Sequence, residues 1–438
     1  MDFEKIRYEN IDEELVKFTH SSGLKVYVLP KKGYYKKFAA FGTNYGSVDS
    51  EFFIPGETKA TKVPDGIAHF LEHKLFEQKD GNVMDKFSAL GASPNAYTSF
   101  NQTVYWFTCT EKFDECFKLL LEYVQNPYIT PESVEREKGI IGQEIKMYED
   151  NPGWRVYFNL LNAMFKVHPA KKDIAGTVES IADIDKDILY KCFNTFYHPS
   201  NMVVIVGGDI DEKEVFESVE KFIQKKEPID DIKRIYPKEP DEINQHYIEE
   251  AMEVSTPIFY MGFKDKRGSE SKDETLASKD LAKRESAIKI IQEMIFGKSS
   301  KIFNLLYSKG LVDGSFGYDY TIEKDYSYSM LGGESKNPQE VKDIIVEEIR
   351  KLKDGDFNDA DFEMTKKMMK GRFVRNLNSV EKPCRAFMST YFKGINVFDY
   401  YDLYTNIDFE YTKNVFVDHF AEDMLAMSVV KPFSKKES

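Results

Sequence analysis

The chain has 438 residues, of which 42% are hydrophobic and 14% aromatic, so it is long enough for two or three domains and too apolar for a disordered segment. Its 60 basic and 74 acidic residues give a net charge of −14, which argues against a nucleic-acid partner. No apolar run reaches about 18 residues, so we expect no membrane-spanning helix and no membrane partner. The first residues lack a signal-peptide pattern and the four cysteines are scattered, so we expect a cytoplasmic location and free, buried thiols.

The first half of the chain predicts alternating strands and helices. The run from Val104 to Phe107 is apolar on both faces, which is typical of a sheet covered by helices. Strands are expected at residues 24–29, 38–45, 95–109 (as a pair) and 202–206, and helices at 66–78, 83–90, 113–124, 131–149, 154–165, 184–196 and 212–223.

A charged segment with three prolines separates the two halves. Residues 225–244 read KKEPIDDIKRIYPKEPDEIN. Because proline fixes φ and removes a hydrogen-bond donor, this segment should form neither a helix nor a central strand. We therefore predict a linker at 226–244 between an N-terminal domain, 1–225, and a C-terminal domain, 245–438.

The second half repeats the order of the first. Strand material is expected at 248–263, 316–331 and 424–430, and helices at 287–296, 302–307, 339–352, 359–375, 385–392 and 409–420. This similarity favours an internal duplication, with two unrelated α+β domains as the alternative. The predicted fold is α+β, with two homologous domains that each contain a mostly antiparallel sheet covered by helices.

The sharpest motif is H-x-x-E-H at residues 69–73. In a helix, His69, Glu72 and His73 share one face, opposite the face of the apolar residues Phe70 and Leu71. Two histidines one turn apart suit a tetrahedral zinc ion, and the order of the motif is that of the inverted zincins. The alternative is a surface helix with solvated side chains.

A third ligand should be a carboxylate from another element. The predicted helix at 131–149 carries Glu137 and Glu144, which are seven residues apart and share a face with Ile140 and Ile141. These apolar neighbours favour a partly buried site. Spacing alone does not choose between the two glutamates.

Three segments together resemble the pitrilysin/insulinase family of zinc metallopeptidases, and the overall look is closest to its short bacterial members. These segments are GIAHFLEHKLFE (66–77), PNAYTSFNQTVYWF (94–107) and EREKGIIGQE (135–144). The resemblance covers the first half well and the second half weakly. It implies a zinc metalloendopeptidase built as a half-clamshell.

The resemblance also implies roles for individual residues. His69, His73 and Glu144 match the zinc ligands, Glu72 matches the general base, and Glu137 matches a second carboxylate that assists catalysis without binding the metal. The segment Asn95, Ala96, Tyr97 and Thr98 matches an edge strand to which substrate peptide adds by backbone pairing. Zinc would lower the pKa of a bound water towards ~7, and Glu72 would accept the proton of that water.

The second half departs from the family pattern. It lacks a metal helix, because AIKIIQEMIF (287–296) has no histidine, so one Zn²⁺ per chain is expected. Where many members carry an Arg and a Tyr that face the zinc, the sequence has Leu306 and Asp313. Tyr318 and Tyr320 lie nearby and are candidate substrate-binding phenols, with packing inside a tyrosine-rich sheet as the alternative.

The resemblance implies partners as well. Four domains of this kind enclose a chamber in the family, so a two-domain chain is expected to form a homodimer, or a heterodimer with a related subunit. Such a chamber favours short or unfolded peptides. Two other functions stay open: a non-catalytic, peptide-binding subunit of a heterodimeric peptidase, and another metal enzyme in which Cys109 or Cys116 is the third ligand.

Overall fold

The computed structural model describes residues 3–265 and 274–433, and its chain forms two compact units. Unit 1 comprises Met1–Ile145, Lys172–Tyr236 and Asn376–Phe392, and unit 2 comprises Lys146–Lys171, Pro237–Arg375 and Lys393–Ser438. Each unit therefore takes one segment from the opposite half of the sequence. The two domains predicted from the sequence are each one continuous segment, so this exchange of segments was not predicted.

The predicted linker has the expected local structure. Residues 226–244 form no helix or strand, and a single isolated bridge joins Arg234 to Phe52. The change between the units after Tyr236 falls within this segment.

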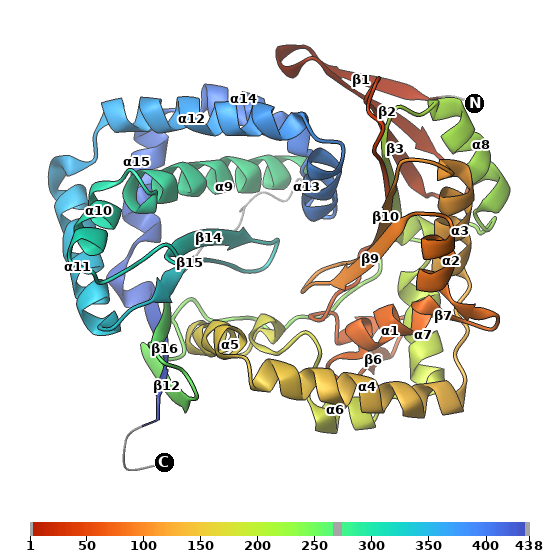
Figure 1. Ribbon diagram of the computed structural model, residues 1–438, viewed down its shortest axis with the longest axis horizontal. Coiled ribbons are helices and arrows are strands. Elements are labelled where there is room, and N and C mark those ends of the chain that lie inside the picture. Colours follow the sequence, from red (N-terminus) through yellow and green to blue (C-terminus); the bar gives the residue numbers. More distant parts are fainter. Residues whose placement is uncertain (1–2, 266–273, 434–438) are drawn as a thin grey trace. The chain divides into compact units, whose positions relative to one another are not determined.

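Unit 1 contains a seven-stranded sheet in the order β1-β2-β3-β11-β4-β10-β9 (Figure 1). Its neighbouring strands are antiparallel except for the parallel pair of β3 and β11. The strands are β1 (Glu4–Tyr8), β2 (Glu13–Thr19), β3 (Lys25–Pro30), β4 (Lys37–Thr43), β9 (Ser93–Thr98), β10 (Thr103–Cys109) and β11 (Met202–Gly208). Strands β1 and β2 lie outside the predicted elements.

Helices cover both faces of this sheet, as the apolar run in β10 predicts. On one face, Tyr105 packs against Tyr123 of α3 (Phe113–Gln125). On the other face, Arg385 of α13 (Glu381–Tyr391) lies over the ring of Trp106. Because α13 belongs to the exchanged segment, the second half of the sequence supplies part of the core of unit 1.

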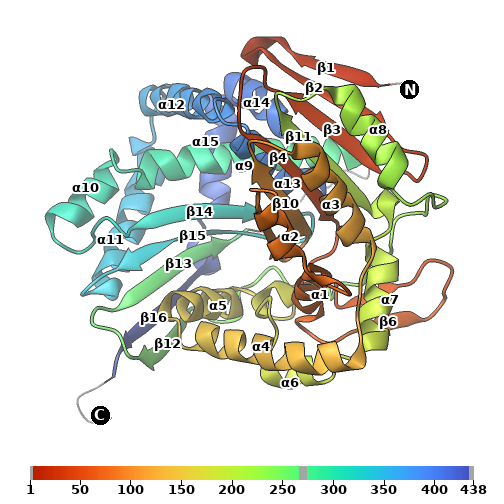
Figure 2. The same cartoon turned by 45° about the vertical axis from the view of Figure 1, so that its right-hand side comes forward.

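The remaining elements of unit 1 are short strands and helices around the sheet. They are β5 (Glu51–Phe53), β6 (Ala60–Lys62), α1 (Ile67–Phe76), β7 (Glu77–Gln78), β8 (Gly81–Asn82), α2 (Val83–Ala89), α6 (Val178–Ala182), α7 (Lys186–Phe196) and α8 (Glu212–Phe222). Helix α4 (Pro131–Glu149) begins in unit 1 and ends in the range assigned to unit 2. In Figure 1 α1 lies between β9 and α4, and Figure 2 also shows α1 next to α4.

Unit 2 contains a five-stranded sheet in the order β12-β16-β13-β15-β14. Its strands are β12 (Tyr247–Met252), β13 (Ile258–Lys264), β14 (Gly317–Ile322), β15 (Ser327–Glu334) and β16 (Leu425–Pro432), and only β12 and β16 are parallel. The exchanged helix α5 (Pro152–Met164) packs on β12, β13 and β16. The other helices are α9 (Glu274–Phe296), α10 (Lys301–Ser308), α11 (Pro338–Lys351), α12 (Asp359–Leu377), α14 (Tyr400–Asn406) and α15 (Phe409–His419).

The two sheets confirm the predicted fold class. Each unit is an α+β unit with a mostly antiparallel sheet and one parallel strand pair. The predicted helix at 287–296 is the second half of the longer α9, and the strand region at 316–331 corresponds to the hairpin of β14 and β15. Among the described residues, no helix has both the length and the apolar character needed to cross a bilayer.

Candidate metal centre

Helix α1 carries the H-x-x-E-H motif at the predicted spacing. The apolar side chains of Phe70 and Leu71 are completely buried, which fixes the rotation of the helix. His69 and Glu72 are 8% exposed, so they lie in a nearly dry environment rather than on a solvated face. The alternative of an exposed surface helix is therefore wrong.

The start of α1 is fixed by a close backbone approach. Gly66 precedes the helix with φ of +91°, and a Cβ at this position would meet the carbonyl oxygen of Ala175 at 2.3 Å. Only glycine adopts this conformation at such a distance without strain. The loop around residue 175 thus determines where α1 begins and, with it, where the motif lies.

Helix α4 supplies both predicted carboxylates and gives them different partners. Glu144 Oε1 lies 3.8 Å from His69 Nε2, and Glu144 Oε2 lies 3.5 Å from His73 Nε2. Glu137 lies on the other side of His73, with Oε1 3.0 Å from Nδ1. The structure therefore distinguishes the two glutamates by their partners, which their spacing in the sequence could not do. Of their apolar neighbours, Ile141 is buried but Ile140 is 51% exposed, because it faces a pocket.

The donor set of His69, His73 and Glu144 fits a zinc ion. One ligand atom from each residue lies within 4.8 Å of the others, and no other group of this kind occurs in the described part of the chain. Zinc bonds of about 2.1 Å in a tetrahedral arrangement place ligand atoms about 3.4 Å apart. The distances of 3.5 and 3.8 Å from Glu144 to the two imidazoles are close to this value.

The environments of the three titratable side chains on α1 differ. Burial, followed by the charge of His73, lowers the pKa of His69 to about 4, so its imidazole is neutral at pH 7, as a metal ligand must be. Burial also opposes the charged form of His73, but the hydrogen bond that its ring donates to Glu137 and the nearby carboxylates raise its pKa overall. Burial raises the pKa of Glu72, while the hydrogen bond from Thr98 acts in the opposite direction.

Glu72 is held beside the ligands by the neighbouring strand. The Thr98 hydroxyl of β9 donates a hydrogen bond of 2.7 Å to Glu72 Oε2. This contact joins α1 to the strand that was predicted to bind substrate. It was not predicted from the sequence, because the two residues are 26 positions apart and lie on different elements.

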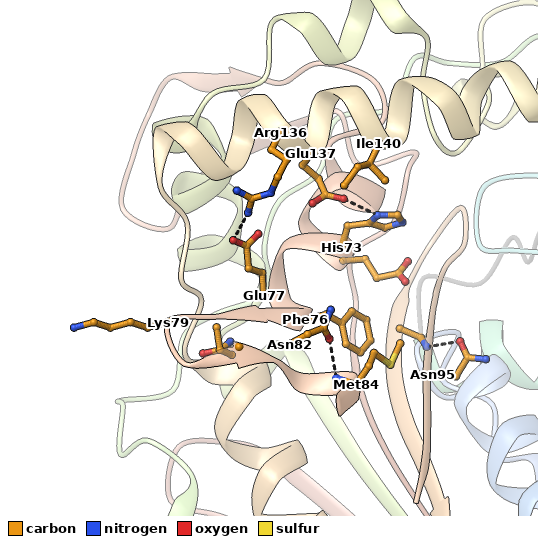
Figure 3. A pocket seen from close by; sticks show the side chains of 14 residues that line it. His73, Phe76, Glu77, Lys79, Asn82, Met84, Asn95, Arg136, Glu137 and Ile140 are labelled. Carbon is orange, nitrogen blue, oxygen red and sulfur yellow. Dashed lines mark hydrogen bonds and ion pairs between the residues drawn. The ribbon is translucent and has the colours of Figure 1, made fainter. Parts of the chain in front are cut away.

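A pocket of about 670 Å³ lies next to the candidate centre in unit 1 (Figure 3). Figure 3 shows Glu137 reaching the ring of His73, and Arg136 reaching Glu77. Asn95 of β9 also lines this pocket. The pocket therefore extends from His73 to Asn95 and Ala96 of the edge strand.

The predicted substrate-binding residues Asn95, Ala96, Tyr97 and Thr98 all belong to β9, the last strand of the sheet in unit 1. β9 pairs only with β10 among the described strands, so one side of its backbone has no partner strand. Among the side chains of β9, the Tyr97 hydroxyl accepts a hydrogen bond of 2.7 Å from the side-chain amide of Gln102.

The two candidate phenols lie in unit 2 and have partners there. The Tyr318 hydroxyl donates to Glu293 at 2.6 Å, and the buried Tyr320 hydroxyl donates to Asp265 at 2.5 Å. Of the residues aligned with the family's Arg and Tyr, Leu306 is buried and Asp313 is exposed. A role of either phenol in substrate binding stays a prediction.

All four cysteines are free and buried, as predicted. Neither Cys109 nor Cys116 belongs to the group of possible metal ligands found among the described residues. The geometry thus favours Glu144 over a cysteine as the third ligand.

Comparisons with known proteins agree with this centre. The model of the insulinase family (peptidase family M16) matches residues 55–178, and the model of the M16 inactive domain matches residues 183–369. Over 432 residues the chain is 41% identical to the uncharacterized zinc protease YmfH of Bacillus subtilis (strain 168), a match that covers 98% of this chain and 99% of that protein. The chain belongs to the M16 family.

Two solved structures share the fold of this chain. The crystal structure of an M16-like peptidase from Alicyclobacillus acidocaldarius superposes with a TM-score of 0.90 at 32% identity, over 99% of both chains. A protease from Helicobacter pylori has a TM-score of 0.78 at 21% identity, over 96% of this chain and 100% of that one. The candidate ligands His69, His73 and Glu144 all lie within residues 55–178, the range that the insulinase family model matches.

Proposed function

We propose that this M16 protein is a zinc-dependent endopeptidase that hydrolyses short or unfolded peptides, with Glu72 as the general base. One observation supports this proposal above all others. Glu72 lies on the same helix face as His69 and His73, yet it is absent from the group of candidate ligands and its carboxylate is held by Thr98. A carboxylate next to a metal site that does not bind the metal is free to transfer protons.

The candidate ligands would hold the ion, and the side chains around them would transfer protons and orient the ligands. His69, His73 and Glu144 would bind one Zn²⁺ per chain, which supplies Lewis acidity and lowers the pKa of a bound water towards ~7. Glu72 accepts the proton of the attacking water and later donates it to the leaving amine. Glu137 assists by fixing the ring orientation of His73.

The edge strand β9 would bind the substrate. An extended peptide can pair with the free side of the β9 backbone, next to Asn95 and Ala96, and only an unfolded segment offers such a backbone. Tyr318 is a further candidate for substrate contact, whereas Tyr320 is buried and its hydroxyl already donates to Asp265. We also propose that two chains, identical or related, associate to enclose the peptide.

The test compares Glu72→Gln with Glu135→Gln in the full-length chain. Glu135 is an exposed glutamate on α4 that forms an ion pair with Lys138, so its substitution controls for the loss of one charge. We expect zinc-loaded Glu72→Gln to bind one equivalent of zinc and to lose at least about 10³-fold of peptide cleavage. Glu135→Gln should cleave like the wild type. A peptide-library digest gives the cleavage rates, and metal analysis gives the zinc content.

The outcomes separate the candidate functions. Full cleavage by Glu72→Gln would contradict the role of Glu72. Peptide binding without turnover, in wild-type protein that carries one zinc per chain, would instead favour the non-catalytic subunit of a heterodimeric peptidase. The mass of the wild-type protein in solution, with and without peptide, tests the proposed dimer.

A further inference from the structure

We propose that Lys74 is a positioning residue for the metal centre, which acts by holding Glu137 in the orientation that fixes the ring of His73. This inference rests on the proposed zinc site. It concerns a residue of α1 that lies outside both the ligand set and the H-x-x-E-H motif.

Lys74 is a buried cation in unit 1. Its side chain is completely inaccessible to solvent, which is rare for a lysine and unfavourable unless the ammonium group has polar partners. It has three: the carboxylate of Glu77, the backbone carbonyl oxygen of Ser133 at 3.4 Å, and Glu137 Oε2 at 3.9 Å. The last two partners belong to α4, so Lys74 connects the helix of the histidines to the helix of the glutamates.

Glu137 is thereby held from both sides. Its Oε1 lies 3.0 Å from His73 Nδ1, and its Oε2 faces the ammonium group of Lys74. A carboxylate fixed at both oxygens has one orientation, so the imidazole ring that it contacts also has one orientation. That orientation directs Nε2 of His73 towards Glu144, 3.5 Å away.

The contacts continue beyond Lys74 with alternating charge. Glu77, the closest partner of Lys74, also forms an ion pair with Arg136 of α4. Five side chains, from His73 through Glu137, Lys74 and Glu77 to Arg136, thus form one row of paired groups. In this row Lys74 is the only member that contacts both carboxylates.

A simpler role for Lys74 would be to attach α1 to α4. In that case its removal would weaken the fold, and the consequence for zinc would not depend on Glu137. If Lys74 acts through Glu137, its removal should matter only while the Glu137 carboxylate is present. A double-mutant cycle measures this difference directly.

The cycle uses the full-length chain as wild type, Lys74→Met, Glu137→Ala and the double variant. Competition with a chelator at fixed pH gives the Kd for zinc, and thermal unfolding of the zinc-free proteins reports on the fold. We expect Lys74→Met to raise the Kd about 10-fold and Glu137→Ala to raise it about 10- to 100-fold, as for other groups that support metal ligands. In the Glu137→Ala background, Lys74→Met should leave the Kd within about 2-fold.

Two controls isolate the effect. Lys138→Met removes a partly buried lysine of α4 that is paired with Glu135, and should leave the Kd unchanged. Glu77→Gln removes the other carboxylate partner of Lys74 and should change the Kd by no more than about 2-fold. Lys74→Gln replaces Lys74→Met in the cycle if the methionine variant does not fold.

The outcomes distinguish this inference from the proposed function. A wild-type chain that binds no zinc overturns the proposed function, and this inference with it. If the wild type binds zinc and removing Lys74 raises the Kd equally with and without Glu137, or not at all, the positioning role is overturned while the proposed function stands. Loss of the effect in the Glu137→Ala background supports the positioning role.

Discussion

At the scale of single residues, the candidate centre depends on how each carboxylate is held. Glu144 faces the Nε2 atoms of both histidines, Glu137 contacts Nδ1 of His73, and Glu72 accepts a hydrogen bond from Thr98. Three chemically similar side chains therefore have three different partners. Because a proton acceptor and a metal ligand need different surroundings, these partners are the basis for assigning the roles.

Thr98→Val tests whether the hydroxyl group that holds Glu72 contributes to turnover. Valine has nearly the same shape as threonine and suits a strand, but it cannot donate to the carboxylate. A hydrogen bond to a charged group contributes about 1.5–3 kcal/mol, so we expect kcat to fall at least about 10-fold. KM and the Kd for zinc should stay within about 2-fold of the wild-type values.

Steady-state kinetics on a fluorogenic peptide gives kcat and KM for this variant. Thr108→Val, on the adjacent strand β10, is the matched control because Thr108 is neither a candidate ligand nor one of the residues that line the pocket beside the centre. A fall in kcat of the same size in both variants would mean that the strands, not the contact to Glu72, are responsible.

At the scale of elements, the geometry of α4 determines which atom of His73 each of its two glutamates contacts. Two glutamates seven residues apart lie on one face of a helix, separated by about 10 Å along its axis. Glu137 and Glu144 can therefore contact His73 from opposite sides of its ring. Between them, Gly139 is exposed and a Cβ at this position would meet no atom within 4 Å.

Gly139→Ala should stabilise the protein. Alanine favours the helix over glycine by about 0.5–1 kcal/mol, and the open space at residue 139 accepts the added methyl group. We expect the free energy of unfolding, measured in urea, to rise by about this amount while the Kd for zinc stays the same. Gly46→Ala is the opposite case, because its Cβ would lie 2.2 Å from the carbonyl oxygen of Phe100, and it should lower the free energy of unfolding. Destabilisation by Gly139→Ala would contradict this account of α4.

At the scale of the whole molecule, the two units share an architecture but differ in what they bury. Unit 1 holds the candidate metal ligands, of which His69 is buried and His73 and Glu144 are partly exposed. Unit 2 buries Asp265 instead, which accepts two hydrogen bonds from Arg284, at 2.9 and 2.6 Å, and one from Tyr320. His419 Nδ1 lies 3.6 Å from the same carboxylate. The polar interior of unit 2 is thus an ion-pair network with a role in stability.

This network makes the stability of the protein sensitive to acid. Burial opposes the charged form of Asp265, but His419 and Arg284 hold the pKa of this carboxyl well below its usual range. Because the pKa is lower in the folded than in the unfolded state, the network stabilises the fold above pH ~4 and loses this contribution as the pH falls further.

Asp265→Asn tests the network. Asp265→Asn removes the buried carboxylate partner of Arg284 and leaves it the ion pair with the exposed Asp418, so we expect the free energy of unfolding at pH 7 to fall by about 3 kcal/mol. The variant should also lose less stability than the wild type as the pH falls below ~4, because it has no carboxylate to protonate. Urea unfolding at several pH values measures both effects. Identical pH profiles of the two proteins would contradict the role of Asp265.

The sequence determined the features that depend on local spacing. The helix repeat places His69, Glu72 and His73 on one face whatever surrounds them, and the apolar residues of β10 indicated a covered sheet. The prolines between the two halves identified a segment without helices or strands. Each of these signals extends over only a few residues, within which covalent geometry fixes the arrangement.

Only the tertiary structure decided what depends on packing between distant segments. The resemblance already implied different roles for Glu144 and Glu137, but only the structure gave them different partners. It also placed Thr98 against Glu72 and Lys74 against Glu137, and showed that α5 and α13 pack on the sheets of the opposite halves. None of these contacts has a short-range signal, because each depends on the rotation of one helix against another element. That rotation is set by the packing of many side chains in the core. The sequence of a single element does not show how its side chains will pack against the other elements.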